Sequence, residues 1–437
     1  MKSVKIIIAL LFLSQATFAQ SIISLINRAD SFFATMDSGK FDEAHGFFDE
    51  SVKDKISADE LKLFWLRLGN SLGTYESVNG AQNRSQGEFY QVTLNCVFTK
   101  GTQGFTFIFN KSEKLLGFFV APTASEAVYV APAYADTNLY REKEVGIQFA
   151  GGQMAGLLTT PKNGTNFPLV VFVHGSGPSD MDESVGPNKP LKDLAIGLAA
   201  KGIASIRYVK RSMVYPNNFT KAFTVKEEVL DDALTAVEIA RNTPGINKGQ
   251  IYVMGHSLGG MLAPRIAALA PDLAGIILAA APARKLSDLI AEQNKYLYVS
   301  SGDTTAVMRR QFEETSGEID RTRLLKLGDI APDSVILSAP AAYWMDINNY
   351  DQLASARKLK NRILVIQGEN DFQVSVQDFN MWRTALASNK NASFKLYPDL
   401  NHLLSSQKQK GNGMQYRIPA NVSAKLIEDI AVWIKGK

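Results

Sequence analysis

Cysteine is almost absent from the sequence, which limits how the fold can be stabilised. Cys96 is the only cysteine among 437 residues, so no intramolecular disulfide can form. It lies in the apolar segment 92–98, a strand-like pattern in which a lone cysteine serves as a small buried hydrophobic residue. The fold must therefore depend on its noncovalent core.

Charge of one sign is also scarce. Lys and Arg number 47 against 43 Asp and Glu, a net charge of +4, and the basic residues are scattered along the chain. The sequence therefore has neither the basic footprint of a nucleic-acid-binding protein nor a polybasic membrane-binding segment. It also has no phosphate-loop or dinucleotide-binding glycine pattern and no pair of histidines at metal-ligand spacing. No cofactor, no metal and no nucleic-acid partner are expected.

Hydrophobic runs long enough to span a membrane are also missing, and the N-terminus has only a short one. Lys2 and Lys5 precede the apolar run 6–13, which is too short to span a bilayer. Small residues then follow at the positions that a signal peptidase recognises. The pattern predicts a signal peptide over residues 1–19, cleaved before Gln20. The protein is expected to be exported, periplasmic or extracellular, and to have no stable membrane anchor.

The hydrophobic pattern divides the rest of the chain into two domains. Residues 20–120 show helical patterns followed by strand patterns, which is typical of a small α+β domain. An Ala- and Pro-rich linker is expected at 121–140. Strand and helix patterns alternate over 141–437, which predicts an α/β domain with a mostly parallel sheet flanked by helices. A polar helical insertion at about 284–328 is expected to form a lid.

The pentapeptide Gly255–Gly259 carries the strongest functional signal. It follows the apolar run 251–254 and opens a helical stretch. This matches the nucleophile elbow, a tight strand–helix turn that projects a serine above a sheet. A second Gly-x-Ser-x-Gly copy, Gly69–Gly73, instead follows a helical run, and its glycines are typical of a helix C-cap. Ser257 is therefore the candidate nucleophile, and Ser71 is not.

A serine nucleophile needs a base within hydrogen-bond reach and an acid that orients the base. The chain order on this fold is serine, acid, histidine, and His402 is the only histidine after Ser257. Asp371 is the favoured acid because it lies deep in the turn that follows a strand pattern. Glu369, in the same turn, is the second choice. Asp399 is the third, because it is so close to the histidine in sequence.

An oxyanion hole needs two backbone N–H groups directed at the developing negative oxygen. One is expected from Leu258, the residue after the nucleophile. The other is expected from the glycine-flanked loop after an early strand, with Ser176 as first choice and Gly175 as the alternative. Tyr343 and Trp344 are candidate walls of a substrate-binding pocket, and simple core packing is the competing interpretation for each.

From about residue 141 onward the sequence resembles secreted bacterial α/β-hydrolases of the esterase kind, related to dienelactone hydrolases and prolyl oligopeptidases. The shared motifs, in order, are His174–Pro178, Gly186–Pro190, Arg207–Arg211, the elbow, Tyr343–Asp346, Gly368–Asp371 and Asn401–His402. The N-terminal domain resembles nuclear transport factor 2 in layout, so the chain is similar to two-domain bacterial carboxylesterases. The resemblance implies a Ser257–Asp371–His402 triad acting on small acyl esters.

Val209 departs from the pattern of this group, in which an acidic residue is expected at that position. The departure puts a local ion pair with Arg211 in doubt and does not affect the triad. His174 and His256 lie inside motifs, but neither is in the position of the base. We expect His174 to support residues that contact the substrate without contacting it itself. We expect His256 to pack as part of the elbow.

Together these patterns predict a serine hydrolase that cleaves small-molecule carboxylic esters through an acyl-enzyme intermediate. The alternatives are a serine peptidase or aminopeptidase of the prolyl oligopeptidase type, and a thioesterase. The peptidases usually carry a propeller domain or an acidic pair that binds the substrate amine, and neither is evident. A binding module without chemistry is disfavoured because no triad position is lost. Homo-oligomerisation through the N-terminal domain is left open.

Overall fold

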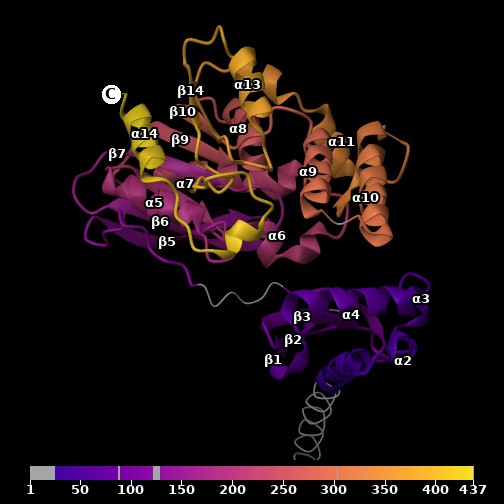
Figure 1. Ribbon diagram of the computed structural model, residues 1–437. Coiled ribbons are helices and arrows are strands. Elements are labelled where there is room, and N and C mark those ends of the chain that lie inside the picture. The colour runs from indigo at the N-terminus through magenta and orange to yellow at the C-terminus, as the bar shows by residue number, and fades with distance from the viewer. Residues whose placement is uncertain (1–24, 87–88, 122–127, 303, 327, 437) are drawn as a thin grey trace, which may run out of the picture. The chain divides into compact units, whose positions relative to one another are not determined.

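The chain folds into two units. The computed structural model describes residues 25–86, 89–121, 128–302, 304–326 and 328–436 (Figure 1). The chain divides between Glu126 and Ala127, and each unit is described by itself. The expected signal peptide, with its cleavage point, lies outside the described residues. Within the described ranges, no helix is long and apolar enough to cross a membrane.

The N-terminal unit combines helices with an antiparallel sheet. Its helices are 25–37, α2 (Phe41–His45), α3 (Glu50–Lys53) and α4 (Ala58–Leu72). Its strands β1 (Tyr75–Gln86), β2 (Phe89–Phe98), β3 (Gly101–Phe109) and β4 (Leu115–Val120) lie side by side in that order. Its core is rich in phenylalanine, and Cys96 is buried in it as a free thiol. The predicted α+β character is confirmed.

Ser71 lies in the last turn of α4. Ser57 begins this helix with a capping box, in which its hydroxyl accepts from the Glu60 N–H and the Glu60 carboxylate accepts from the Ser57 N–H. Gly73 follows the helix with φ 82°, a conformation that favours glycine. The Ser71 hydroxyl donates to the carbonyl of Leu68 at 3.2 Å. The second Gly-x-Ser-x-Gly copy is therefore a helix end.

An eight-stranded sheet forms the centre of the second unit. Its strands are β5 (Tyr140–Phe149), β6 (Gly152–Pro161), β7 (Phe167–Val173), β8 (Ala204–Tyr208), β9 (Ile246–His256), β10 (Gly275–Ala279), β13 (Arg362–Gly368) and β14 (Ala392–Tyr397). They lie in the order β14-β13-β10-β9-β7-β8-β6-β5. β6 pairs antiparallel with both of its neighbours, and the other pairs are parallel. The carboxyl ends of the parallel strands therefore share one edge.

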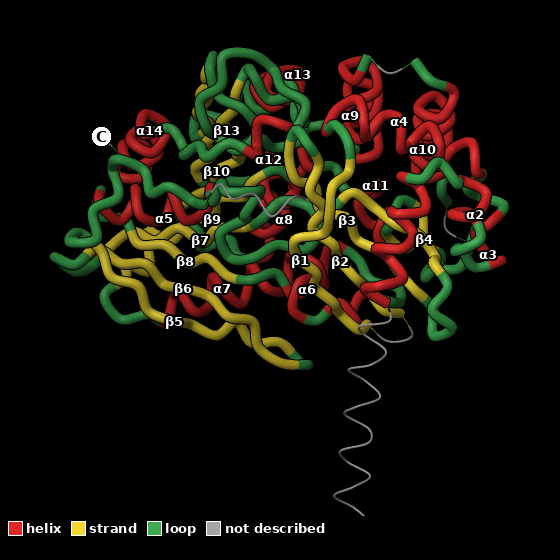
Figure 2. The backbone as a smooth tube through the Cα atoms, turned by 60° about the horizontal axis from the view of Figure 1, so that its bottom comes forward, coloured by secondary structure: helices red, strands yellow, loops and turns green. Residues whose placement is uncertain are grey.

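Helices cover both faces of this sheet (Figures 1 and 2). α5 (Pro190–Ala200) and α14 (Ala424–Lys435) pack on one face, and α7 (Asp231–Asn242), α8 (Leu258–Leu269) and α13 (Val376–Ala385) on the other. Successive residues of β7 alternate between the two cores: Val171 packs on the α7–α8 side, and Val170 and Phe172 pack on the α5–α14 side. A strand buried on both faces has a continuous apolar run. The predicted α/β architecture is confirmed.

The insertion between β10 and β13 is longer than the expected lid at 284–328. It contains α9 (Leu286–Ser301), α10 (Ala306–Leu324), the hairpin β11 (Val335–Ile336) and β12 (Ala339–Pro340), α11 (Ala341–Asn349) and α12 (Gln352–Arg357). Only α9 and α10 fall within the expected bounds. The later part escaped the prediction because it is apolar: Ile336, Trp344 and Ile347 are buried in the core of the unit.

Part of the expected linker at 121–140 belongs to the second unit. Residues 122–127 lie outside the described residues, but from position 128 the chain is tied to the helices of the sheet. The Tyr129 hydroxyl donates to Asp193 at 2.7 Å, and the Tyr134 hydroxyl donates to the carbonyl of Val422 at 2.8 Å. The low charge of this stretch suggested a linker. Instead, two tyrosine hydroxyls hydrogen-bond it to the second unit.

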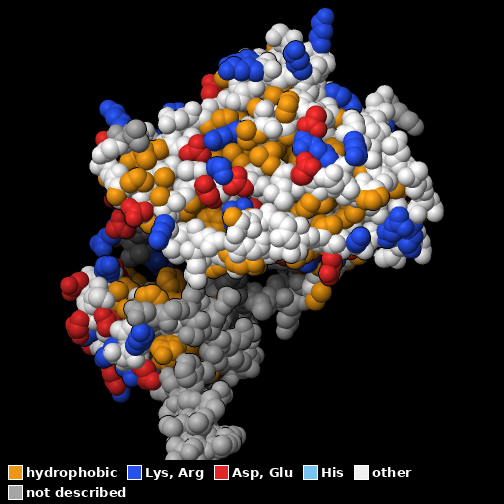
Figure 3. All heavy atoms as spheres, turned by 180° about the vertical axis from the view of Figure 1, so that it is seen from behind, with side chains coloured by type: hydrophobic (Ala, Val, Ile, Leu, Met, Phe, Trp, Pro, Cys, Tyr) orange, Lys and Arg blue, Asp and Glu red, His pale blue; other side chains and the backbone are white. Residues whose placement is uncertain are grey.

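Exposed charge is mixed on the second unit. Lys and Arg side chains are interspersed with Asp and Glu on the face seen in Figure 3, in keeping with the small net charge of +4. In the part of the chain that the structure describes, no group of three or more His, Cys, Asp or Glu side chains could hold a metal ion. Several charged side chains are buried instead, and among them Glu183, Lys210 and Asp371 lie in segments that follow β7, β8 and β13.

Candidate active site

Ser257 stands at the turn between β9 and α8. Its backbone has φ 52° and ψ −119°, a conformation that costs free energy in a residue other than glycine. Its N–H donates to the carbonyl of Ala279, at the end of β10, at 2.9 Å. A Cβ on Gly255 would lie 2.1 Å from the carbonyl oxygen of Gly259, and one on Gly259 would lie 2.3 Å from that of Val173. The strand and helix can meet this closely only through glycine, as a nucleophile elbow requires.

Asp371 and His402 are joined by a hydrogen bond. Asp371 follows β13, His402 follows β14, and both side chains are buried. Nδ1 of His402 lies 2.8 Å from Oδ2 of Asp371, which also accepts from the Gln367 amide at 3.1 Å. Oδ1 accepts from the backbone N–H groups of Gln373 and Val374 at 2.7 and 2.9 Å. These donors fix the carboxylate, which in turn orients the imidazole with its Nδ1–H toward the acid.

The two alternative acids face elsewhere. Glu369 is exposed, and its backbone N–H donates to the carbonyl of Tyr397 at 2.8 Å. Asp399 is also exposed, and its carboxylate accepts from the hydroxyl of Ser406 at 3.1 Å. Among the described residues, the carboxylate that hydrogen-bonds the His402 ring is the one first chosen from the sequence.

Two cavities meet at Ser257. The larger has a volume of about 500 Å³ and extends under the helical insertion. The smaller, of about 360 Å³, is lined by His402, His256 and Glu183. Ser257 and Ser176 line both cavities. A substrate bound across the serine would therefore have one part in each.

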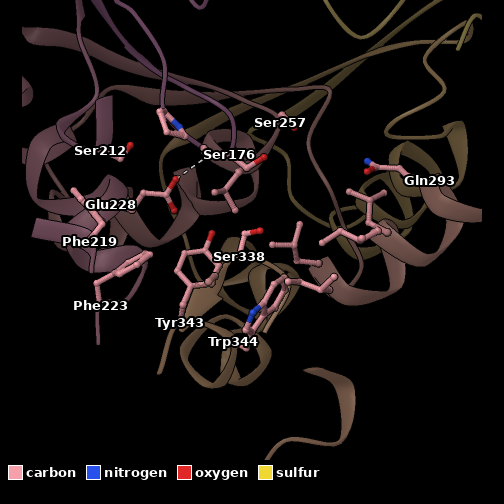
Figure 4. A pocket seen from close by; sticks show the side chains of 18 of the residues that line it. Ser176, Ser212, Phe219, Phe223, Glu228, Ser257, Gln293, Ser338, Tyr343 and Trp344 are labelled. Atoms are coloured by element: carbon pink, nitrogen blue, oxygen red, sulfur yellow. Dashed lines mark hydrogen bonds between the residues drawn. The ribbon is translucent and has the colours of Figure 1, made fainter. Parts of the chain in front are cut away.

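Aromatic and aliphatic side chains from separate segments form the larger cavity (Figure 4). Tyr343 and Trp344, the two candidate wall residues, come from α11 and line it although both are buried. Nε1 of Trp344 donates to the carbonyl of Ile336 at 2.7 Å, and burial together with the charge of the nearby Glu228 carboxylate raises the pKa of the Tyr343 hydroxyl. The other apolar lining residues include Phe219, Phe223, Leu258, Leu286, Leu289, Ile290 and Leu337. The cavity is thus mainly apolar, with one carboxylate at its wall.

Two backbone N–H groups lie beside the serine. Leu258 is the first residue of α8, so its N–H has no partner within the helix. Ser176 lies in the loop after β7 and is exposed at both cavities. The N–H of Gly175, the alternative second donor, is already engaged, because it donates to Oε1 of Glu183 at 2.6 Å. This arrangement favours Ser176 over Gly175 as the second donor.

The carboxylate of Glu183 connects the Ser176 loop to the base. Its Oε2 lies 3.0 Å from Nδ1 of His256, whose Nε2 lies 2.8 Å from the carbonyl oxygen of His402. Burial acts to lower the pKa of His256, but the charge of Glu183 outweighs it and the pKa is raised. Burial acts to raise the pKa of Glu183, but the pairing with His256 lowers it to about 2. The ring of His256 therefore lies between the carboxylate of Glu183 and the backbone of His402.

A second buried ion pair lies near the same loop. Nζ of Lys210 and Oε1 of Glu228 are 2.7 Å apart, and the side chains are only 3% and 7% exposed. Glu228 belongs to the π-helical turn η2 (Lys226–Leu230) that precedes α7. These residues are not evident from the sequence, because charges at a helix start are typical of a solvated first turn. The available signal was the position of the lysine within the motif Arg207–Arg211.

Arg211 pairs with a residue distant in sequence. Its guanidinium donates to the carboxylate of Asp232 on α7 and lies over the ring of Phe149, 4.4 Å from its centroid. The N–H of Val209 donates to the carbonyl of Ala155 on β6 at 2.8 Å. The missing acidic residue at 209 is therefore compensated by an aspartate from another element.

His174, directly after β7, is fully buried and packs edge-on against the ring of Tyr208, with centroids 5.3 Å apart. Burial lowers its pKa to about 4, and the positive charge of Lys210 acts in the same direction against the opposing charge of Glu183. The imidazole is therefore neutral at pH 7. It supports the loop that begins at Gly175 as a packed, uncharged ring.

Acid should destabilise the protein through His174. Its folded-state pKa of about 4 lies below the ordinary value of 6.5, so the unfolded chain binds the proton first as the pH falls. The loss of unfolding free energy between pH 6.5 and 4 from this residue is about 3 kcal/mol. His174→Gln should show a flatter decline than the parent in urea denaturation across that range. His256 has the opposite sign: because its pKa is raised, its contribution to the free energy of unfolding is full below pH 6.5 and is lost as the pH rises through its folded-state pKa. An identical decline in variant and parent would contradict this origin.

The chain resembles known hydrolases along most of its length. A model described as the alpha/beta hydrolase family matches residues 170–409. A model described as a protein of unknown function matches residues 29–118, so the likeness of the N-terminal unit to nuclear transport factor 2 stays a prediction. Esterase EstD of Thermotoga maritima is 34% identical over 403 residues, which cover 92% of this chain and 93% of that protein.

Two solved structures are similar at lower identity. An esterase of Pyrococcus furiosus is 15% identical, with a TM-score of 0.44 over 68% of this chain and 91% of that chain. Est1E of Butyrivibrio proteoclasticus is 15% identical, with a TM-score of 0.44 over 67% of this chain and 99% of that chain. The family model spans more than half of the sequence, and the Thermotoga relative aligns along nearly all of it. The chain belongs to the α/β-hydrolase family.

Proposed function

We propose that the protein is a serine hydrolase that cleaves carboxylic esters of small acyl groups through an acyl-enzyme. One observation carries the proposal: a buried aspartate hydrogen-bonds a histidine that shares a cavity with the elbow serine. The residues are Ser257, Asp371 and His402. Membership of the family and 34% identity to a protein named as an esterase support an ester as the substrate.

The residues can divide the reaction into two steps. Nε2 of His402 takes the proton of the Ser257 hydroxyl while Oγ bonds to the ester carbonyl carbon, and Asp371 stabilises the imidazolium. The carbonyl oxygen becomes negative and accepts hydrogen bonds from the N–H groups of Leu258 and Ser176. The C–O bond to the alcohol then breaks, and His402 gives its proton to the leaving oxygen. Water repeats the sequence on the acyl-enzyme, releasing the acid and the free serine.

The two cavities can accommodate the two halves of an ester. Because His402 protonates the leaving alcohol, the alcohol belongs on the His402 side, in the cavity of about 360 Å³. The acyl group then enters the cavity of about 500 Å³ beside Tyr343 and Trp344. This volume lies within the usual range of small-molecule sites. Each buried methylene there contributes about 0.8 kcal/mol, so apolar acyl groups are favoured.

Removal of the nucleophile gives the most direct mutational test. Ser257→Ala should lower kcat for p-nitrophenyl esters by on the order of 10⁵–10⁶, as loss of a triad serine does in other enzymes. Ser71→Ala is the matched control, since that serine lies at a helix end, and it should leave kcat near the parental value. Retained activity in the first variant, or lost activity in the second, would contradict the assignment.

The same assay separates the competing substrate classes. Oxygen esters, thioesters and aminoacyl anilides should be compared on the parent and on Ser257→Ala, and we expect the parent to act fastest on oxygen esters. A preference for anilides would favour a peptidase, and a preference for thioesters would favour a thioesterase. Either result would leave the nucleophile in place and change only the substrate.

Narrowing the larger cavity should change acyl-chain preference. Ile290, on α9, lines this cavity, so Ile290→Trp would fill space expected to hold the acyl chain. The ratio of kcat/KM for a hexanoyl ester to that for an acetyl ester should fall by roughly tenfold or more. Val299→Trp, on the same helix at a residue 68% exposed, is the control and should leave the ratio unchanged. An unchanged ratio in Ile290→Trp would place the acyl group elsewhere.

We also propose that the protein is exported. The basic and apolar pattern of residues 1–19 supports this, together with the small residues that end it. Mass spectrometry of the protein from fractionated bacterial cells should find an N-terminus at Gln20 in the periplasm or the medium. A chain that retains Met1 and stays in the cytoplasm would contradict the proposal.

A further inference from the structure

Three buried charged groups hold the loop that carries Ser176. The N–H of Gly175 donates to Oε1 of Glu183 at 2.6 Å, and its carbonyl accepts from Nζ of Lys210 at 2.9 Å. On the other side, the N–H of Gly177 donates to Oε1 of Glu228 at 3.1 Å (dashed line in Figure 4). Both neighbours of Ser176 are therefore fixed by charge-assisted hydrogen bonds, which are stronger than neutral ones.

Each of these charged groups also has a buried side-chain partner. Lys210 pairs with Glu228 at 2.7 Å, and Glu183 pairs with His256 at 3.0 Å. A buried ion pair is costly to desolvate and adds little stability over an apolar pair of the same size. Both pairs hydrogen-bond the backbone of the same three-residue loop, 175–177. We infer that they are present to fix the position of this loop and not to stabilise the fold.

The three charged residues that hold the loop come from separate parts of the chain, which the sheet brings together. Glu183 lies in the loop before α5 with φ 54°, a strained conformation for a glutamate. Lys210 follows β8, and Glu228 lies in the π-helical turn η2. Glu228 also lines the larger cavity, so it reaches the wall of that cavity as well as the loop.

We propose that Lys210 and Glu228, together with Glu183, are positioning residues that hold the N–H of Ser176 in place for the oxyanion. The proposal rests on the proposed ester hydrolysis, in which that N–H stabilises the tetrahedral intermediate. A donor that is fixed beforehand does not need to reorganise as charge develops. The ion pairs act through the loop and do not touch the reacting atoms.

Variants of one ion pair test the proposal. Lys210→Met removes the donor to Gly175 and leaves Glu228 buried without its counter-charge. The double variant Lys210→Met/Glu228→Gln removes both charges. We expect Lys210→Met to lower both the melting temperature and kcat. The double variant should recover most of the melting temperature, while kcat stays on the order of 10- to 100-fold below the parent and KM changes less than threefold.

A second readout isolates the oxyanion itself. A trifluoromethyl ketone adds to the serine and mimics the tetrahedral intermediate, so its Ki should rise in parallel with the loss of kcat/KM in the double variant. Arg241→Met, which removes a surface ion pair to Asp272, is the control and should change neither quantity.

The outcomes separate the two proposals. If kcat and Ki return to parental values together with the melting temperature in the double variant, the pair is structural only and the inference is wrong. The inference is also wrong if the parent is active and Lys210→Met has the same kcat as the parent. A parent that hydrolyses no ester would contradict the proposed function, and with it this inference.

Discussion

The close approach of β9 and α8 at Ser257 is the constraint on which the rest of the site depends. Gly255 and Gly259 let the backbones meet where any side chain would overlap a neighbouring carbonyl oxygen, and the serine between them takes a left-handed conformation. The strain at this residue places its hydroxyl at the junction of two cavities and its following N–H at a free helix start. The remaining groups are arranged around that fixed point.

Buried polar groups supply the second level of organisation. Asp371 accepts four hydrogen bonds and so orients His402, while Glu183, Lys210 and Glu228 fix the loop that carries Ser176. Each charge has its own partner within the fold, which limits the cost of desolvation. Local electrostatic pairs thus fix the residues of the site. The apolar cores on the two faces of the sheet fix the strands that carry those residues.

Sequence patterns predicted the parts of this arrangement that depend on chain order and on strand or helix character. Ser257, Asp371 and His402 each follow a parallel strand, so one edge of the sheet brings them together. The residues that the sequence did not reveal act across the fold: Glu183, Lys210 and Glu228 look solvated in sequence and become functional candidates only through burial. The insertion between β10 and β13 extends past the bounds expected for a lid because its later, apolar part has the sequence pattern of a core segment.

The central claim is that Ser257 carries the acyl group during turnover. The most direct measurement is rapid acid quenching of the enzyme with an excess of a p-nitrophenyl ester, followed by peptide mass spectrometry. The peptide that contains Ser257 should gain the mass of one acyl group, and the corresponding peptide of Ser257→Ala should lack this added mass. An active enzyme with no covalent acyl group, or with the acyl group on another residue, would contradict it.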